Sequence, residues 1–263
     1  MNKILKKIEF SSIVTCFVVD APAVANSCRA GHFVIVRTGE KGERIPLTIA
    51  NSDKATGSIW LIIQRAGVST NKLCDLNEGD YITDLVGPLG KSTEVKNFGT
   101  VVCACGGVGA APMLPIAKAL KKAGNRIIVI LAARNKELII LEDQFREFAD
   151  EVIVYTDDGS YGTKGLVTNG VEAIIKREKV DKVEAIGPAI MMKFVSLLTK
   201  DYNIPTEVSL NTIMVDGTGM CGACRITVDG QTKFVCVDGP EFDGHKVDFD
   251  EMLMRQNYKQ EAK

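Results

Sequence analysis

Histidine is scarce in this sequence, and neither sign of charge is in excess. Only two histidines occur, His32 and His245, so a catalytic triad or a metal site built on histidine is not expected. The 32 basic and 33 acidic residues nearly cancel, which gives a net charge of −1. A chain without excess positive charge has no overall field that would hold a polyanion. The sequence therefore does not predict a nucleic-acid-binding protein.

Long hydrophobic runs are also missing. Apolar runs such as 127–133 are far shorter than the ~20 residues that cross a bilayer, so no membrane-spanning helix and no membrane partner are expected. A basic N-terminus before the apolar run 13–19 imitates a signal peptide, but Glu9 and Asp20 bracket a stretch that is only marginally long enough. We therefore expect a cytoplasmic protein.

The length and composition predict a folded chain of two domains with an appendage. A chain of 263 residues with 46% hydrophobic and 25% charged residues resembles soluble globular proteins and not disordered ones. From residue 4 to about 90, short apolar runs alternate with turn residues, which is typical of an antiparallel barrel or sandwich. The strands expected there are 13–19, 33–36, 45–50, 59–63 and 81–86.

After residue 90 the pattern changes to buried strands that alternate with amphipathic helices. Such an alternation predicts a doubly wound parallel sheet with covering helices. The expected strands are 100–104, 126–132, 152–155, 182–186 and 206–210, and the expected helices are 111–122 and 138–148. From about residue 211 a loop and a probable hairpin follow. We divide the chain into a β-barrel (1–95), an α/β domain (96–210) and a C-terminal segment (211–263).

The C-terminal segment carries the strongest functional signal. Eight cysteines in a chain without a secretory signal indicate a reducing compartment, where clustered cysteines more often bind metal or do redox chemistry than form disulfides. Asp216, Cys221, Cys224 and Cys236 reproduce the C-x4-C-x2-C and distant-C spacing of plant-type 2Fe-2S sites, with aspartate in the first position. Intervening glycines let backbone N–H groups turn toward sulfur.

Two alternatives stay open for this cluster. Asp216 is either the fourth ligand, which we favour, or a turn residue beside a site of three cysteines. Three cysteines and a carboxylate could also hold zinc. The loop lacks the two separated CxxC pairs that are usual for zinc, and this favours iron and sulfide.

A glycine-rich turn stands between a predicted buried strand and a predicted helix. Open α/β sheets bind dinucleotide phosphates at such a position, on the N-terminus of the helix. The alternative is a tight strand-to-helix turn without a ligand. The candidate residues of this turn are Gly106, Gly107, Val108, Gly109 and Pro112.

Later loops follow other predicted strands at the same edge of the sheet. Asp157, Asp158 and Gly159 form one of them, and Gly187 with Pro188 forms another. Because ligands bind at the carboxyl edge of open α/β sheets, we include these residues in the candidate nucleotide site. Arg134 follows a further strand and either meets a ribose or phosphate or is solvated.

Several motifs in one order resemble the ferredoxin-NADP reductase superfamily, and within it the electron-transfer subunits of dihydroorotate dehydrogenase and of NADH-dependent ferredoxin:NADP oxidoreductase of the sulfide dehydrogenase type. The residues 44–48, Arg-Ile-Pro-Leu-Thr, resemble the flavin motif R-x-x-[ST] with one extra residue. The other matching segments are 67–70, 106–112, 216–236 and 236–242. The resemblance covers nearly the whole chain.

The resemblance implies an FAD site on the barrel. Arg44 would pair with the pyrophosphate, Pro46 to Thr48 would line the isoalloxazine, and Thr48 would be the catalytic residue near N5. On sequence alone, Arg44 is an exposed strand residue and Thr48 an ordinary β-branched one. The full set implied in FAD binding is Arg44, Ile45, Pro46, Leu47, Thr48, Ile62, Ile63, Gln64, Gly67, Ser69 and Thr70.

The resemblance also implies an oxidoreductase. Nicotinamide exchanges hydride, a 2Fe-2S cluster exchanges single electrons, and flavin does both, so FAD would stand between NAD(H) and the cluster. Asp216 favours the small subunit of the ferredoxin:NADP oxidoreductase, because dihydroorotate-linked subunits have four cysteines. The implied partner is a larger flavin and iron-sulfur subunit in a heterodimer that handles ferredoxin and NADP(H). The other hypotheses are an electron-transfer subunit of dihydroorotate dehydrogenase and a zinc-stabilised nucleotide-binding regulator without turnover.

Overall fold

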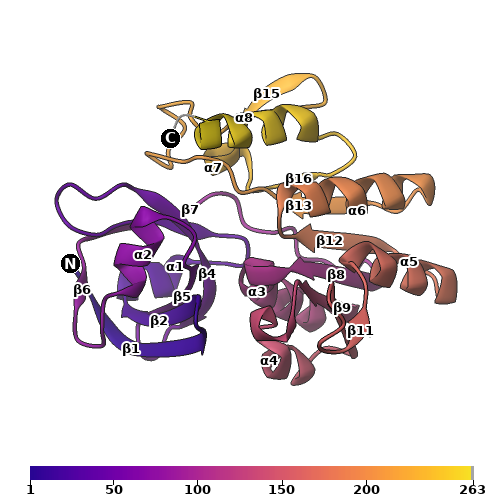
Figure 1. The fold of residues 1–263 in the computed structure, drawn as a ribbon, viewed down its shortest axis with the longest axis horizontal. Coiled ribbons are helices and arrows are strands. Elements are labelled where there is room, and N and C mark those ends of the chain that lie inside the picture. Colours follow the sequence, from indigo (N-terminus) through magenta and orange to yellow (C-terminus); the bar gives the residue numbers. More distant parts are fainter. Residues whose placement is uncertain (262–263) are drawn as a thin grey trace.

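The first sheet of the protein closes on itself as a barrel. The computed structural model describes residues 1–261, with side-chain positions through residue 256, and shows this barrel beside an α/β unit (Figure 1). Its strands follow the order β6-β1-β2-β5-β4-β3-β7, with antiparallel neighbours. Thr83 alone separates β6 from β7, so the two ends of the sheet meet. The strands are β1 (Asn2–Ser11), β2 (Val14–Asp20), β3 (Phe33–Arg37), β4 (Ile45–Asp53), β5 (Ser58–Gln64), β6 (Tyr81–Ile82) and β7 (Asp84–Leu89).

Alternating side chains fill this barrel, as expected for strands with one buried face. Phe17, Val19, Ile59, Leu61 and Ile63 belong to its core, and each is at most 1% exposed. Two short helices, α1 (Pro22–Ser27) and α2 (Val68–Cys74), connect the strands. Strand β1 was not predicted from the sequence, because Lys3, Lys6 and Lys7 interrupt its apolar residues.

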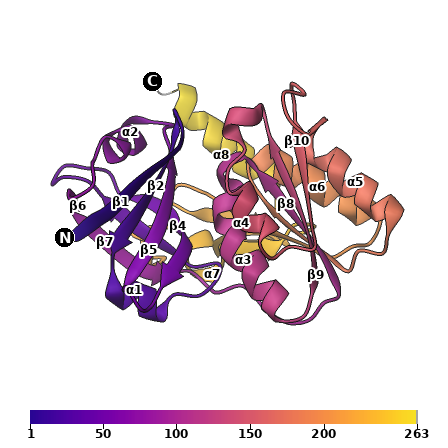
Figure 2. The ribbon, with the colours of Figure 1, turned by 90° about the horizontal axis from the view of Figure 1, so that it is seen from below.

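A mainly parallel sheet forms the second unit, in the order β11-β10-β9-β8-β12-β13-β16. Figure 2 shows α3 and α4 on the side that faces the barrel and α5 and α6 on the other. The strands are β8 (Thr100–Gly106), β9 (Arg126–Ala133), β10 (Glu151–Thr156), β11 (Thr163–Lys164), β12 (Lys182–Ile186) and β13 (Thr206–Ser209). The helical elements are η1 (Gly107–Gly109), α3 (Ala110–Lys122), η2 (Lys136–Leu138), α4 (Glu142–Arg146), α5 (Val167–Arg177) and α6 (Ala189–Asp201).

The predicted helix over 138–148 is shorter in the structure. The chain leaves η2 with an extended backbone at Ile139. Leu141 then has a left-handed backbone with φ of 62°, so α4 begins only at Glu142. Ile140 and Leu141 are both 3% exposed, so their burial in the core under α3 decides the local path of the chain. Tertiary packing therefore overrides helix propensity in this segment.

The C-terminal segment packs on both units. The predicted hairpin is present, and β16 adds an antiparallel edge strand to the parallel sheet by pairing with β13. Phe33 and Ile35 of the barrel share one hydrophobic core with Cys224 and Cys236 of this segment. Its elements are β14 (Arg225–Val228), β15 (Gln231–Phe234), α7 (Val235–Asp238), β16 (Glu241–Asp243) and α8 (Phe249–Glu261).

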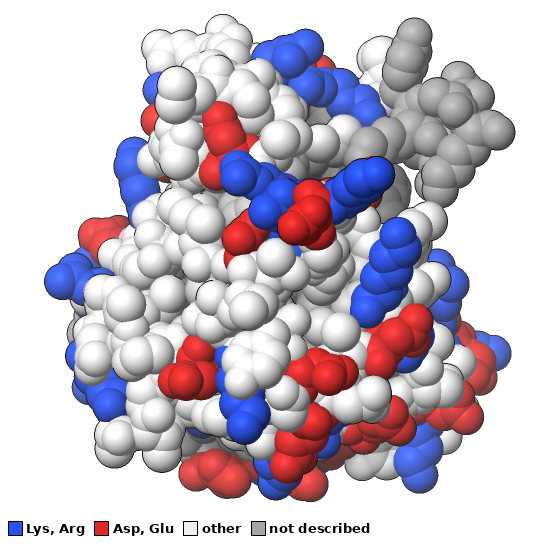
Figure 3. Space-filling view, turned by 90° about the vertical axis from the view of Figure 1, so that its left-hand side faces the viewer, with Lys and Arg blue, Asp and Glu red and all other residues white. Residues whose placement is uncertain are grey.

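The predicted fold class is confirmed: an antiparallel barrel precedes a doubly wound sheet with a C-terminal loop and hairpin. The division at residues 95 and 210 stays a prediction. Through residue 261, the structure contains no helix of the length and apolar character that a bilayer span requires. On the face shown in Figure 3, basic and acidic side chains are mixed, with uncharged surface between them.

Candidate functional site

The parallel sheet reverses its strand order at β8, with β9 and β10 on one side and β12 and β13 on the other. Open α/β sheets bind their ligands at such a point, outside the carboxyl ends of the strands. The turn that starts at Gly106 follows β8, and Gly187 with Pro188 follows β12. A Cβ on Gly187 would lie 3.0 Å from the Cα of Gly106, so these two turns touch. The structure thus brings together two of the predicted nucleotide-binding loops.

The glycines of the turn differ in what they face. Gly107 has φ of 53°, and a Cβ there would meet no atom within 4 Å. A Cβ on Gly109 would overlap the carbonyl group of Ile186. Gly107 thus leaves open space at the end of the sheet, whereas Gly109 allows the turn η1 to pack closely against the end of β12. Val108 lies between them, and Pro112 lies in the first turn of α3, where its missing N–H costs no hydrogen bond.

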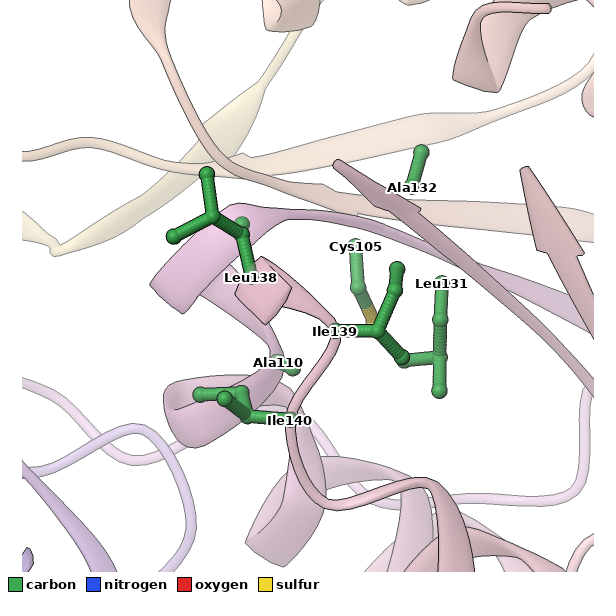
Figure 4. Close-up of a pocket in the computed structure, with 8 residues that line it drawn as sticks. Cys105, Ala110, Leu131, Ala132, Leu138, Ile139 and Ile140 are labelled. Atoms are coloured by element: carbon green, nitrogen blue, oxygen red, sulfur yellow. The ribbon is translucent and has the colours of Figure 1, made fainter. Parts of the chain in front are cut away.

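A small hollow lies beside this turn (Figure 4). Cys105 of β8, Leu131 of β9 and Ala110 of α3 line it together with the segment 138–140. Nearby in the chain, the side-chain oxygen Oδ1 of Asn135 is buried and accepts no hydrogen bond within the described part of the chain. An unpaired buried acceptor in a native structure fits a site that a polar ligand completes.

Backbone hydrogen bonds join the loops that follow β9 and β10. The backbone N–H of Asp158 donates to the carbonyl oxygen of Arg134 at 3.2 Å, and that of Asp157 donates to Ala133 at 3.0 Å. Arg134, Asp157, Asp158 and Gly159 are all exposed at this edge. The pKa of Asp158 is lowered because its carboxylate accepts hydrogen bonds from Ser160. These exposed side chains are free to meet the hydroxyls of a bound nucleotide.

The predicted flavin strand is β4. Its residues Pro46, Leu47 and Thr48 pair with β3, with Thr48 opposite Phe33, and their side chains are half-buried. Ile45 is half-buried as well, and Arg44 is exposed just before the strand begins. Ile45 and Leu47 pack against the barrel core, so Pro46 and Thr48 lie on the opposite face of the strand, which the exposed Arg44 precedes.

The N-terminus of α2 lies next to the beginning of this strand. The hydroxyl of Ser69 donates to the carboxylate of Glu43 at 2.7 Å, and Glu43 directly precedes Arg44. The hydroxyl of Thr70 accepts the N–H of Gly67 at 3.0 Å. The structure therefore brings the predicted segments 44–48 and 67–70 together.

The residues predicted on β5 have different orientations. Ile62 packs with the core under α3, whereas Ile63 is 1% exposed inside the barrel. Gln64 is half-buried at the end of the strand. Ile63 can therefore reach a ligand on the outer surface of the barrel through its backbone but not through its side chain.

The two predicted sites meet between the barrel and the α/β unit. Helix α3 packs against β4, and the glycine turn η1 packs against β5. A nucleotide on the turn and a flavin on β4 would therefore share this junction. Met191 lies at the same place, because a Cβ on Gly187 would be 2.8 Å from its sulfur. The sulfur of Met191 therefore lies against the glycine turns.

The cysteines are only partly assembled. The sulfur atoms of Cys224 and Cys236 are 3.2 Å apart, and both residues are 1% exposed. Burial and the neighbouring Cys224 thiol raise the pKa of the Cys236 thiol to about 12. Cys221 is exposed, and the structure gathers no third metal-ligating side chain with this pair within residues 1–261.

Asp216 faces the backbone of its own loop. Its carboxylate accepts the N–H of Thr218 at 2.9 Å and the N–H of Cys221 at 2.7 Å, and these bonds lower its pKa. Each carboxylate oxygen keeps a further lone pair, so these bonds are compatible with a metal ligand. Gly217, Gly219 and Gly222 all have positive φ, between 66° and 83°, as a loop that wraps an anionic cluster requires. The donor set therefore fits a 2Fe-2S cluster.

Comparison with known proteins supports this description. The iron-sulfur cluster binding domain of dihydroorotate dehydrogenase B matches residues 211–248, and an oxidoreductase NAD-binding domain matches 104–197. An electron transfer subunit homolog of dihydroorotate dehydrogenase B (NAD(+)) from Thermotoga maritima is 48% identical, over 100% of this chain and 93% of the relative. The chain belongs to the family of dihydroorotate dehydrogenase B electron-transfer subunits and their homologues.

Other members and relatives of this family are similar over most of their length. The electron transfer subunit of Clostridium perfringens is 31% identical over 94% of this chain and 97% of that protein. A chain from the NADH-dependent reduced ferredoxin-NADP oxidoreductase, solved in work on flavin-based electron bifurcation, is 46% identical with a TM-score of 0.94, covering 100% of this chain and 98% of that one. Phthalate dioxygenase reductase, at 17% identity and a TM-score of 0.66 over 92% and 95%, shares the fold.

Membership of this family makes the chain an oxidoreductase subunit for electron transfer. The predicted cofactor set of FAD, a 2Fe-2S cluster and NAD(H) agrees with the matches. The hypothesis of a nucleotide-binding regulator without turnover finds no support. Three further polar residues were not predicted from the sequence, because no local pattern distinguishes them from surface residues: Lys182 and Thr93, which are buried, and Glu241, which is half-buried.

Proposed function

We propose that this subunit exchanges hydride with NAD(H) at FAD and passes single electrons through its 2Fe-2S cluster to a larger partner subunit, as in an electron-bifurcating NADH-dependent ferredoxin:NADP oxidoreductase. The observation that carries this proposal is the similarity to a chain of that enzyme over the whole length of both. Flavin and cluster together convert the two-electron chemistry of nicotinamide into single-electron transfer.

The nucleotide would lie on the turn after β8. Gly107 leaves room for phosphate above the N-terminus of α3, where backbone N–H groups attract anions. Gly187 and Pro188 would bound the site on the β12 side, and Arg134 with the loop 157–159 would meet the ribose. The contribution of the protein is to orient the nicotinamide toward β4 and to exclude water from that junction.

The flavin would lie along β4. Arg44 is exposed at the beginning of the strand, so its guanidinium can bind the pyrophosphate in bidentate fashion. Thr48 would present its hydroxyl near the reacting edge of the ring. Gly67, Ser69 and Thr70 would hold the remainder through the N-terminus of α2.

The cluster would bind Asp216, Cys221, Cys224 and Cys236. Met220 is 89% exposed and Val215 is 48% exposed beside these residues. Exposed apolar side chains around an electron carrier suit a docking partner. We propose that the partner subunit, which would handle ferredoxin and NADP(H), covers this loop. All eight cysteines are free within the described chain, which supports a reducing, cytoplasmic location.

Absorbance of the anaerobically purified protein tests the cofactors. We expect flavin bands and a broad shoulder that dithionite bleaches, together with equal amounts of iron and sulfide. Colourless protein that contains zinc would contradict the proposal. Arg44→Ala should weaken FAD retention by about tenfold or more, since a charge-assisted hydrogen bond contributes about 1.5–3 kcal/mol. Arg65→Ala is the matched control, because Arg65 is bound to Asp75 at 2.7 Å in the same barrel.

Co-purification tests the partner. Met220→Asp should reduce recovery of the complex, whereas Met254→Asp, at an exposed position on α8, should not. The alternative is an electron-transfer subunit of dihydroorotate dehydrogenase, which the name of the Thermotoga maritima homologue favours. Recovery of a dihydroorotate-oxidising subunit with this chain would support that alternative.

A further inference from the structure

Three parts of the chain meet at the segment 239–241, which joins α7 to β16. The N–H of Lys91 donates to the carbonyl oxygen of Gly239 at 2.7 Å, and the N–H of Leu210 donates to that of Pro240 at 2.9 Å. The hydroxyl of Thr93 donates to the carboxylate of Glu241 at 2.7 Å. Lys91 and Thr93 belong to the linker between barrel and α/β unit. Glu241 therefore lies where the barrel, the sheet and the cluster-bearing segment are bound to one another.

One lysine faces three carboxylates at this place, of which Glu184 is buried and Glu207 and Glu241 are half-buried. Lys182 is 2.7 Å from Glu184 and 2.5 Å from Glu207, and its ammonium lies 4.3 Å from the centre of the Phe98 ring. Lys182 is 6% and Glu184 is 2% exposed. Glu241 makes no contact with Lys182 but lies close enough to feel the charges of Lys182 and Glu207, so full ionisation of the three carboxylates would leave two uncompensated negative charges. Such a group retains a proton near neutral pH, because low dielectric penalises uncompensated charge.

Of the three carboxylates, Glu241 is the one that no ion pair in the described part of the chain holds in its charged form. Glu184 and Glu207 are both ion-paired with Lys182, whereas Glu241 makes no ion pair within the described residues and holds only the Thr93 hydroxyl. Burial and then the charge of Glu207 raise the pKa of Glu241 to about 7, although the bond from Thr93 opposes this.

Each neighbouring element contributes a group that faces this carboxylate or its network. Burial raises the pKa of Glu184 to about 8. Burial would lower the pKa of Lys182, but the two carboxylates beside it raise that pKa. The facing groups are Glu207 of β13, Lys182 and Glu184 of β12, Asp243 of β16 itself, Thr93 of the linker and the backbone turn at Gly31 of the barrel.

The chain also limits how far Glu241 can be from Cys236, a proposed cluster ligand. Glu241 follows Cys236 by five residues, so their Cα atoms are at most about 18 Å apart when the chain is fully extended. Because α7 coils part of this segment, the true separation is shorter. An extra negative charge within this distance in a poorly screened interior raises the pKa of a carboxylate.

We propose that Glu241 takes up a proton when the cluster-bearing segment receives an electron. The electron derives from the hydride of NAD(H), and the proton comes from water, which reaches the network at the partly exposed Glu207. The carboxylate of Glu241 becomes a carboxylic acid, and the proton returns to water when the electron leaves for the partner. The inference rests on the proposed function, because it needs a redox centre in this segment.

The test is the midpoint potential of the cluster in the purified holoprotein, measured between pH 5 and pH 9. Electron paramagnetic resonance monitors the reduced cluster in each titration. The potential of the native protein should fall as pH rises through the neutral region, since protonation favours reduction. In Glu241→Gln it should be independent of pH there. Thr93→Val removes the hydrogen bond that lowers the pKa of Glu241, so the inflection should move to higher pH. Asp229→Asn, at the exposed turn between β14 and β15 in the same C-terminal segment, is the control and should retain the native profile.

Two outcomes would overturn the inference. One is a pH-independent potential in the native protein, and the other is a native profile in Glu241→Gln. If Glu241→Gln does not fold, redox-difference infrared spectroscopy of the native protein tests the inference instead. Reduction at neutral pH must then produce the C=O band of a carboxylic acid, and Thr93→Val must shift that band. A protein that contains no cluster contradicts the proposed function instead, and the two failures are thereby distinguished.

Discussion

Two neighbouring glycines of the turn after β8 serve different purposes. Gly107→Ala meets no protein atom, so we expect a loss of only about 1 kcal/mol for a left-handed alanine. The added methyl group would occupy the proposed phosphate position, and NADH affinity should fall at least tenfold. Gly109→Ala overlaps the carbonyl of Ile186 and should cost about 1–3 kcal/mol of stability. Chemical unfolding and NADH titration of both variants check this, and unchanged NADH affinity in Gly107→Ala would contradict the proposed site.

Asp216 is the predicted ligand that most needs a test. Asp216→Cys should retain the cluster and shift its potential, because a thiolate is a softer donor than a carboxylate. Asp216→Asn keeps an acceptor for the N–H groups of Thr218 and Cys221 but removes the anionic ligand, so it should lose cluster content. Iron analysis and electron paramagnetic resonance measure both effects. An unchanged potential and spectrum in Asp216→Cys would show that Asp216 only holds the loop.

The sequence predicted those elements whose burial pattern is local. Strand β8 is a continuous apolar run that is buried on both faces, and helix α3 has one continuous buried face; the glycine turn between them has its own conformational signature. The polar group around Lys182 was not predictable. Lys182 and Glu184 alternate along β12 as surface residues do, but both are buried in the folded protein, where Phe98 of the linker lies against the Lys182 ammonium. Likewise, β16 is recognisable as an edge strand only once β13 is placed beside it.

The buried ion pairs of β12 lead to a prediction on stability. Lys182→Met keeps the apolar stem beside Phe98 but leaves Glu184 and Glu207 without a positive partner. Removing one member of a buried pair costs about 3–5 kcal/mol. We therefore expect the free energy of unfolding at pH 7.5 to fall by that amount. Lys182→Met with Glu184→Gln should recover part of the loss, and a single variant as stable as the native protein would contradict the importance of the pair.

At the scale of the whole molecule, the junction of barrel, sheet and C-terminal segment should make stability depend on pH. Burial raises the pKa of Glu184 to about 8 and that of Glu241 to about 7, above their value of 4.5 in the unfolded chain. At these two carboxyls the folded protein therefore binds more protons than the unfolded chain between about pH 4.5 and 8. Their contribution to the free energy of unfolding decreases as pH rises through this window, whereas the lowered pKa of His32 acts in the opposite direction.

Glu241→Gln should flatten this decrease, because glutamine cannot ionise. A pKa unit corresponds to about 1.4 kcal/mol, so the difference between pH 5 and pH 8 should become smaller by roughly 2 kcal/mol. Glu172→Gln, which alters an ion pair with Lys176 on the surface of α5, should leave the slope as it is. Urea unfolding at several pH values measures both. Since the same carboxylate links the barrel, the sheet and the cluster-bearing segment, a flatter slope in Glu241→Gln would show that the protonation state of one residue affects how firmly all three parts are held together.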